Sequence, residues 1–237
     1  MGKFIRTKAL LGDGGFKKLQ NSTVAVFGIG GVGSYAAEAL VRSGVKTVYI
    51  YDNDTVSQSN INRQLIADGD TVGRDKTDVA KERYLKINPD AEIIAVKEFI
   101  TPLSVIPFEK FDYIIDAVDN VAAKLFLAEN AAKSGVPIIS VMGTGNKLRP
   151  ELLKISDIGK TSYCPLCRVM RSQLKKRGIK RLTVVWSDEK PVKASVGEEL
   201  RSTGRPSPSS CAFVPGAAGL MAAAYVVREL ADKNTDI

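Results

Sequence analysis

Short apolar runs and amphipathic segments alternate along the first 142 residues of the chain. Apolar runs rich in β-branched residues predict five strands, over residues 24–27, 47–51, 92–96, 113–117 and 137–142. Apolar residues at helical spacing, followed by glycine or Asn-Pro, predict three helices, over residues 31–43, 75–87 and 120–133. Strands that alternate with helices predict an α/β fold, Rossmann-like and doubly wound, with helices on both faces of a mostly parallel sheet.

The remaining segments depart from this regular alternation. Residues 6–20 predict a short helical lead-in with a glycine break, and strands over residues 152–158 and 182–186 flank a basic helix. A segment rich in Ser, Pro and Arg predicts a mobile loop over 199–210, and an alanine-rich segment predicts a helix over 216–230 that packs on the sheet. We therefore expect a single domain over residues 1–237, made of a core (1–143), an elaboration with a basic helix and a mobile loop (144–210) and a C-terminal helix (211–237).

Composition narrows the class of protein. Of the 237 residues, 44% are apolar and 25% are charged, as in an ordinary globular protein. The N-terminus does not resemble a signal peptide and no run of 18 apolar residues occurs, so we expect a cytoplasmic protein without a membrane span. Three cysteines argue for a reducing compartment rather than a disulfide framework. The chain has no histidine, which excludes a Ser-His-Asp triad, a His-paired thiolate and a His-ligated metal.

A glycine-rich turn follows the first predicted strand and opens the first predicted helix of the core. Its sequence, Gly28-Ile-Gly30-Gly31-Val-Gly33, has the GxGxxG spacing that lets a phosphate approach the backbone at a helix N-terminus. Asp52 ends the second strand and can accept hydrogen bonds from ribose hydroxyls. The pattern predicts a nucleotide-binding core, which suits NAD and ATP equally, whereas a glycine turn without a ligand is the alternative.

The polar segment from Asp54 to Gln64 favours ATP over NAD, and we expect both of its end residues to contact the nucleotide. Within it, Arg63 can hold phosphate oxygens in a bidentate manner and Asn60 can position them. Lys76, near a predicted helix N-terminus, can neutralise charge that develops on the α-phosphate. Solvated positions for Arg63 and Lys76 are the alternative.

Asp119 lies just beyond the carboxyl end of the predicted strand over 113–117. Ligands bind at that edge of such sheets, and a carboxylate there suits magnesium. The alternative is that Asp119 caps the helix that begins near Asn120. Together, Asn60, Arg63, Lys76 and Asp119 predict a catalytic set that works on phosphates.

Five stretches together resemble the superfamily of ubiquitin-activating and sulfur-carrier-activating enzymes, at residues 26–33, 52–64, 72–76, 87–89 and 116–120. The resemblance implies binding of ATP and Mg²⁺ and formation of an acyl-adenylate. By this pattern the glycine turn cradles the nucleotide, Asp52 holds the ribose, and Asp119 works with magnesium. Arg6 matches a family arginine that reaches the ATP of the other protomer, so the resemblance also implies a homodimer.

The cysteines separate two branches of this superfamily. Sulfur-carrier activators typically hold structural zinc with two CxxC pairs, whereas this chain has one pair, Cys164 and Cys167, plus Cys211, so we expect no closed zinc site within the chain. Residues 6–12, 142–150, 157–162, 164–171 and 213–220 resemble the tRNA threonylcarbamoyladenosine dehydratase branch instead. Many members of that branch have Asp where Cys164 stands, which argues against a catalytic role for Cys164.

The formal charge is +8, and seven basic residues crowd one predicted helix and its end: Arg168, Arg171, Lys175, Lys176, Arg177, Lys180 and Arg181. Such a cluster can track RNA phosphates, and a solvated helix face is the alternative. Because the implied substrate is tRNA, we favour RNA contact. Cys211 is a thiol that can take an acyl group or fill apolar space, and a sulfur-transfer or redox partner stays open.

The reaction that the resemblance implies is ATP-dependent cyclisation of threonylcarbamoyl-adenosine in tRNA, with release of AMP and pyrophosphate. One rival is adenylation of the C-terminus of a ubiquitin-like sulfur-carrier protein. Another is an NAD-binding oxidoreductase, against which Arg63 and Lys76 argue, and a third is an RNA-binding scaffold that retains a nucleotide.

Overall fold

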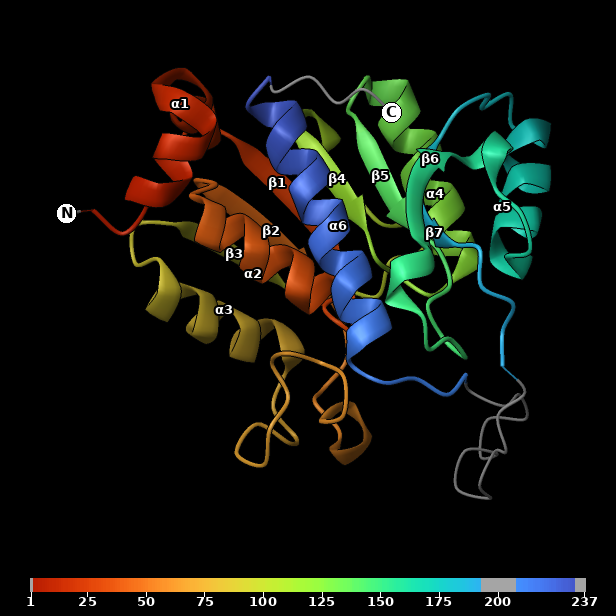
Figure 1. Ribbon diagram of the computed structural model, residues 1–237, viewed down its shortest axis with the longest axis horizontal. Coiled ribbons are helices and arrows are strands. Elements are labelled where there is room, and N and C mark those ends of the chain that lie inside the picture. Colours follow the sequence, from red (N-terminus) through yellow and green to blue (C-terminus); the bar gives the residue numbers. More distant parts are fainter. Residues whose placement is uncertain (1, 193–207, 233–237) are drawn as a thin grey trace.

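The computed structural model describes residues 2–192 and 208–232, so most of the loop predicted over 199–210 lies outside the described residues. One sheet of seven strands crosses the molecule in the order β3-β2-β1-β4-β5-β7-β6 (Figure 1). Every neighbouring pair is parallel except β6 and β7, which confirms the mostly parallel sheet. The strands are β1 Thr23–Phe27, β2 Thr47–Tyr51, β3 Glu92–Val96, β4 Tyr113–Asp116, β5 Ile138–Val141, β6 Leu153–Asp157 and β7 Thr183–Ser187.

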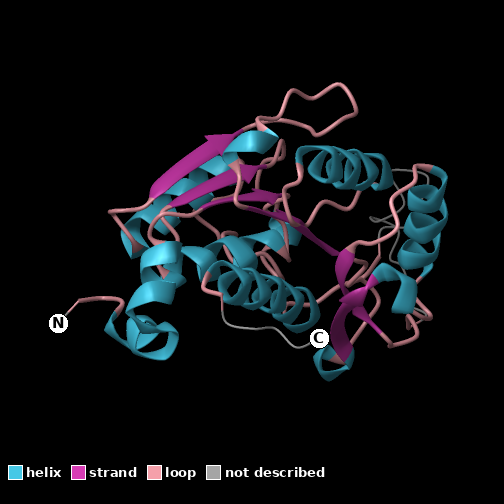
Figure 2. Ribbon diagram, turned by 90° about the horizontal axis from the view of Figure 1, so that it is seen from above, coloured by secondary structure: helices cyan, strands magenta, loops and turns pink. Residues whose placement is uncertain are grey.

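Helices cover both faces of the sheet, as the alternating pattern predicts (Figure 2). Helices α1 (Ile5–Leu19), α2 (Gly33–Ser43), α3 (Lys76–Ile87) and α6 (Phe213–Leu230) contribute to the core on one face. Helices α4 (Val121–Ser134) and α5 (Pro165–Lys176) pack on the other face. The doubly wound architecture is therefore confirmed.

Strand β1 explains why the strands read as continuous apolar runs. Val24 and Val26 point into the core on the α2 side, whereas Ala25 and Phe27 point into the core on the α4 side. Because successive side chains of a strand face opposite ways and both faces are covered, no polar alternation is needed. The sheet core is consequently dry on both sides of β1.

Local sequence signals set the ends of the elements close to where the pattern predicts them. Gly44 adopts the left-handed conformation that closes α2, and Gly12 breaks the helical geometry within α1. The side chain of Asn120 accepts hydrogen bonds from the N–H groups of Ala122 and Ala123, so Asn120 is the N-cap of α4. The alternative that Asp119 caps α4 is therefore wrong, and the Asp119 carboxylate is not needed to cap the helix.

The direction in which the chain adds strands reverses between β1 and β4. From β1 the chain continues to β2 and β3 on one side, and later to β4 and β5 on the other. The carboxyl ends of β1 and β4 therefore lie side by side at a topological switch point, where α/β sheets bind ligands. The glycine turn follows β1 there, and residues 117–120 follow β4.

Helix α6 is long and apolar enough to cross a membrane by length and composition, but half of it is buried inside the fold. Two glycines let it lie close to α2: a Cβ at Gly219 would lie 2.2 Å from the carbonyl oxygen of Val32, and one at Gly216 would lie 3.2 Å from the ring of Tyr35. Its apolar residues serve the packing of the core.

Candidate nucleotide-binding site

The glycine turn at the end of β1 tolerates no side chain at its first and last glycines. Gly28 has a φ of 86°, and a Cβ there would lie 2.8 Å from the carbonyl oxygen of Ala117. A Cβ at Gly33 would lie 1.7 Å from the carbonyl oxygen of Gly28, so α2 can begin only against a bare backbone. Within the described part of the chain, the N–H groups of Gly30, Gly31 and Val32 donate no hydrogen bond. The turn therefore presents unpaired donors at a helix N-terminus, which is the chemistry that binds phosphate.

Asp52 braces this turn from the end of β2. Its Oδ2 accepts the N–H of Ile29 at 2.7 Å, and its Oδ1 accepts the N–H of Asp54 at 2.9 Å. The carboxylate therefore fixes the conformation of the glycine turn. The predicted ribose contact stays a prediction.

Residues Arg63 and Gln64 lie over the middle of the glycine turn. A Cβ at Gly31 would lie 3.4 Å from Cγ of Arg63, and one at Gly30 would lie 3.8 Å from Nε2 of Gln64. The guanidinium of Arg63 donates to the carbonyl of Ser59 at 2.7 Å and to Oδ1 of Asn62 at 3.0 Å. These are exposed contacts that a phosphate could replace.

Gln64 carries an unsatisfied polar atom at this place. Its side chain is buried, and Oε1 has no hydrogen-bond partner among the described residues. Buried polar atoms are nearly always paired, so an orphan beside a glycine turn indicates a missing donor. A bound nucleotide would supply that donor, and we take this as the test that the site fits ATP.

Asn60 forms hydrogen bonds within its own segment, in addition to its predicted role at the phosphates. It ends the 3-10 turn Gln58–Asn60, and its Oδ1 accepts the N–H of Ser57 at 3.1 Å in a capping box. Its carbonyl accepts the N–H groups of Arg63 and Gln64 at 3.0 and 2.9 Å. Asn60 therefore shapes the segment that presents Arg63 and Gln64 to the turn.

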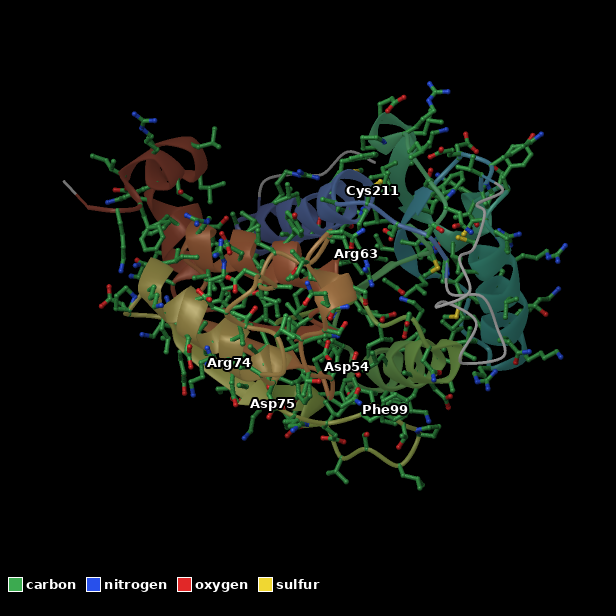
Figure 3. All side chains as sticks on the ribbon, turned by 90° about the horizontal axis from the view of Figure 1, so that it is seen from below. Asp54, Arg63, Arg74, Asp75, Phe99 and Cys211 are labelled. Carbon is green, nitrogen blue, oxygen red and sulfur yellow. The ribbon has the colours of Figure 1, made fainter. Side chains whose placement is uncertain are left out.

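Lys76 is the first residue of α3, and its ammonium points toward the same carboxylates. Nζ lies 2.7 Å from Oδ2 of Asp54 and 3.8 Å from Oδ1 of Asp52, and only 6% of the side chain is exposed. Figure 3 shows Asp54 in the same region as Arg74 and Asp75, at the start of α3. The structure thus brings Asp52, Asp54 and Lys76 together, as the sequence predicts.

Asp119 is exposed beyond the end of β4 and forms no hydrogen bond or ion pair with the described residues. Over residues 2–192 and 208–232, no group of three or more Cys, Asp or Glu side chains is placed to hold a metal ion. Magnesium is commonly held by one or two carboxylates together with substrate phosphates and water. One free carboxylate beside a phosphate site fits that mode.

The sequence analysis does not predict the buried ion pair of Asp116 and Lys124, which lies close to Asp119. Lys124 of α4 is 1% exposed, and its Nζ lies 3.2 Å from both oxygens of Asp116, which is fully buried. The ammonium also donates to the carbonyl of Val141 at 2.7 Å, and Ser140 donates to Asp116 at 2.5 Å. Oδ1 of Asp116 accepts the N–H of Val118 at 3.2 Å, so the network holds the loop that carries Asp119.

Cys211 lies beside the polar segment from Asp54 to Gln64, which the distance between them in the sequence does not indicate (Figure 3). Nδ2 of Asn62 donates to the carbonyl of Ser210 at 2.9 Å and thereby ties the chain before Cys211 to the neighbour of Arg63. The Cys211 thiol is partly exposed. Its predicted role as an acyl acceptor stays a prediction, now with a location near the glycine turn.

The remaining predicted site residues lie apart from this cluster. Arg6 is exposed in the first turn of α1. Helix α1 leads into the amino end of β1, whereas the glycine turn follows the carboxyl end of β1 (Figure 1). The structure does not bring Arg6 to the site of its own chain. The seven basic residues follow α5 and the segment after it, on the other side of the sheet.

Cys164 and Cys167 are free thiols buried at the N-terminus of α5. The neighbouring Cys167 thiol lowers the pKa of Cys164 to about 6, helped by the N–H groups of Cys167, Gly143 and Leu166 and opposed by burial. The same thiol pairing, together with burial, raises the pKa of Cys167. The pair thus favours the thiolate on Cys164 and the protonated thiol on Cys167.

Comparison with known proteins assigns the family. A model described as the ThiF family matches residues 5–236. The chain belongs to the ThiF family. The tRNA threonylcarbamoyladenosine dehydratase of Bacillus subtilis (strain 168) is 44% identical to this ThiF chain over 240 residues, covering 96% of the chain and 94% of the relative. The family resemblance predicted from the motifs is confirmed.

Two solved structures of Escherichia coli tRNA N6-threonylcarbamoyladenosine dehydratase, TcdA, share the fold. The AMP complex superposes on this ThiF chain with a TM-score of 0.87 and the ATP complex with 0.86, each at 30% identity. Each comparison covers 98% of the chain and 94% of TcdA. TcdA thus binds AMP and ATP, and ATP is the nucleotide that the segment from Asp54 to Gln64 favours in this chain.

Proposed function

We infer that this ThiF chain catalyses the ATP-dependent dehydration of threonylcarbamoyl-adenosine in tRNA. The observation that carries the inference is nearly full-length similarity to a tRNA threonylcarbamoyladenosine dehydratase, at 44% identity. Unpaired backbone donors of the glycine turn, with Arg63, Gln64 and Lys76 close to it, support binding of a nucleoside triphosphate there. The comparisons favour neither carrier-protein adenylation nor NAD-dependent oxidation.

The chemistry begins with a free carboxylate on the threonylcarbamoyl group. A carboxylate is a poor electrophile because its leaving group would be oxide. Its attack on the α-phosphorus of ATP forms an acyl-AMP and expels pyrophosphate. The neighbouring carbamoyl group then closes onto the activated carbonyl and expels AMP, so the nucleoside loses one water. The nucleophile is part of the substrate, so proximity replaces a catalytic thiol.

Arg63 and Lys76 carry the charge of this reaction in our proposal. The guanidinium of Arg63 exchanges its contacts with Ser59 and Asn62 for phosphate oxygens and holds them in a bidentate manner. Lys76 is pre-positioned by Asp54 and Asp52 and neutralises charge that develops at the α-phosphate. Asn60 and Gln64 keep this segment over the glycine turn.

Asp119 would hold Mg²⁺ together with phosphate oxygens. When bound, the ion would neutralise phosphate charge and orient the leaving pyrophosphate. The buried pair of Asp116 and Lys124 fixes the loop from which the Asp119 carboxylate projects.

We also propose that the protein is a single-domain homodimer of the cytoplasm. The family resemblance gives Arg6 a role at the ATP of the other protomer, and the exposed position of Arg6 away from the site of its own chain supports this arrangement. Both β6 and β7 continue the sheet of the core, which supports one domain. A cytoplasmic location follows from ATP and tRNA as substrates.

The proposal is tested by pyrophosphate release from ATP and Mg²⁺ with tRNA that carries threonylcarbamoyl-adenosine, followed by mass analysis of the nucleoside. We expect RNA-dependent release and loss of one water. Arg63→Ala should lower kcat by about 100-fold or more, because a charge-stabilising donor is lost from the transition state.

Arg74→Ala is the matched control for that variant. Arg74 lies nearby at the start of α3, but its guanidinium pairs with Glu82 on the surface, so its loss should leave turnover unchanged (Figure 3). An absence of turnover with fully modified tRNA would sink the dehydratase proposal. Pyrophosphate release with a carrier protein instead would establish the rival adenylation.

A further inference from the structure

Helix α5 has one buried side and one basic side. Cys167, Met170 and Leu174 are buried in a core cluster with α4 and β7. Basic residues occupy the exposed positions of the helix and of the segment after it. The structure places five of the seven cations in two groups, one engaged in the fold and one lining a cavity, which the sequence alone does not distinguish.

Two of the arginines are already engaged in holding the fold. Arg171 donates to the carbonyl and the hydroxyl of Thr161, and so ties α5 to the 3-10 turn Ile158–Lys160. Arg177 donates to Gln173 and lies 3.6 Å from Glu129 of α4. These side chains have structural partners that a ligand would have to displace.

Three other cations surround a cavity of about 640 Å³ between α5 and that turn. Arg168, Lys175 and Lys180 stand at its rim, and their side chains form no hydrogen bond or ion pair with the described residues. The buried residues Ile158 and Leu174 lie beneath the cavity, and the partly buried Ile179 adds apolar surface to its lining. None of the described residues that line the cavity is acidic.

The cavity therefore combines unpaired positive charge with an apolar surface. A sugar–phosphate backbone needs cations placed along a track, and a splayed base needs an apolar surface to cover its face. Single-stranded RNA presents both. An acidic protein segment could also pair with the rim, so binding of RNA and binding of an acidic protein have to be compared.

We propose that this groove binds single-stranded nucleotides that flank the modified adenosine of the tRNA. The inference rests on the proposed function, because it needs RNA as the substrate. Helix α5 packs on α4, and α4 begins directly after Asp119 and its cap Asn120. Twelve residues of α5 extend about 18 Å, which is the length over which its exposed cations could follow an RNA backbone.

The experiment compares two double charge reversals. Lys175→Glu with Lys180→Glu changes the groove, whereas Lys81→Glu with Lys86→Glu makes the same change of net charge on exposed positions of α3. Binding of tRNA is measured at several salt concentrations, and turnover is measured with modified tRNA.

We expect the groove variant to bind tRNA at least tenfold more weakly than the α3 variant. The slope of log K against log salt should fall by about one for each phosphate contact removed. As a second measurement, tRNA that contains photoreactive uridine should crosslink wild-type protein within residues 158–180, which does not depend on the folding of a variant.

The outcomes separate this inference from the proposed function. If wild-type protein neither binds nor turns over modified tRNA, the proposed function fails and the groove proposal falls with it. If wild-type protein turns over tRNA but the two reversals behave alike and no crosslink maps to residues 158–180, only the groove proposal is overturned. The groove proposal would also be overturned if the Lys175→Glu, Lys180→Glu variant lost binding to an acidic protein but still bound tRNA like wild type.

Discussion

At the scale of single residues, the buried ammonium of Lys124 helps to hold the loop that carries Asp119. Its ammonium contacts Asp116, Ser140 and the end of β5 in a place without water access. A buried ion pair contributes little net stability, because desolvation offsets its attraction. Removing one partner is different, since the other is left charged and unpaired.

Lys124→Met should therefore lower the free energy of unfolding by about 3–5 kcal/mol, because Asp116 would be left buried without a cation. Lys133→Met on the same helix is the matched control. Lys133 is exposed and pairs with Glu129, so its loss should cost about 1 kcal/mol or less. Urea unfolding of the three proteins measures both values, and equal effects of the two variants would contradict the argument.

Some residues of the site could be placed from the sequence, and others could not. The placement of Asp52 and Lys76 near the glycine turn was predictable, because Asp52 follows β2 and Lys76 opens α3. Lys124 was not, because a lysine in an alanine-rich helix ordinarily points to water, and only the packing of α4 turns it toward Asp116. The contact between Asn62 and Ser210 spans 148 residues and has no local signal at all.

At the scale of elements, the N-terminus of α5 holds an unusual charge. The Cys167 thiol and nearby N–H groups keep the pKa of Cys164 at about 6, against an ordinary value of 9.0. Because the folded value is the lower one, ionisation of Cys164 stabilises the fold at high pH. That contribution is complete above pH 9 and is lost as the pH falls toward 6.

The stability of wild-type protein relative to Cys164→Ser should therefore rise between pH 6 and pH 9, by at most about 1.4 kcal/mol per pH unit. Cys167 stays protonated throughout this window, because its pKa is raised. Cys211→Ser is the control for the loss of a thiol, because it leaves Cys164 and Cys167 in place. Chemical unfolding at pH 6, 7.5 and 9 measures the slope, and a flat difference for Cys164→Ser would refute the assignment.

Element boundaries followed local chemistry and were therefore predictable. Strands β2 and β3 match the predicted ranges, and α2 starts at Gly33, where the glycine turn ends, rather than at residue 31. The antiparallel direction of β6 was not predictable, because apolar runs carry no strand direction. Direction depends on the path of the chain through α5, which periodicity does not encode.

At the scale of the whole molecule, the position of α1 gives the homodimer a testable consequence. Arg6 lies at the edge of the sheet opposite to the glycine turn, so it would serve the site of a partner (Figure 1). Arg6→Ala and Arg63→Ala should then damage different sites of a mixed dimer.

Each variant alone should be inactive, whereas an equal mixture after subunit exchange should recover about a quarter of wild-type activity, because half of the dimers carry one intact site. Lys8→Ala, which removes an exposed cation from the same helix, should leave activity unchanged. Sedimentation measures the oligomeric state of each protein. Failure of the mixture to recover, with exchange verified, would rule out an arginine shared between protomers.

The packing of α6 against the glycine turn has a consequence for biosynthesis. Pro215 lies 3.4 Å from the Cβ position of Gly31, and Gly219 meets the backbone of Val32, so the last helix touches the first turn of the site. Its apolar face also covers the sheet beside α2. A nascent chain that ends before Phe213 leaves that face open to water. We therefore expect the glycine turn to reach its final packing only after α6 has been synthesised and has packed against it.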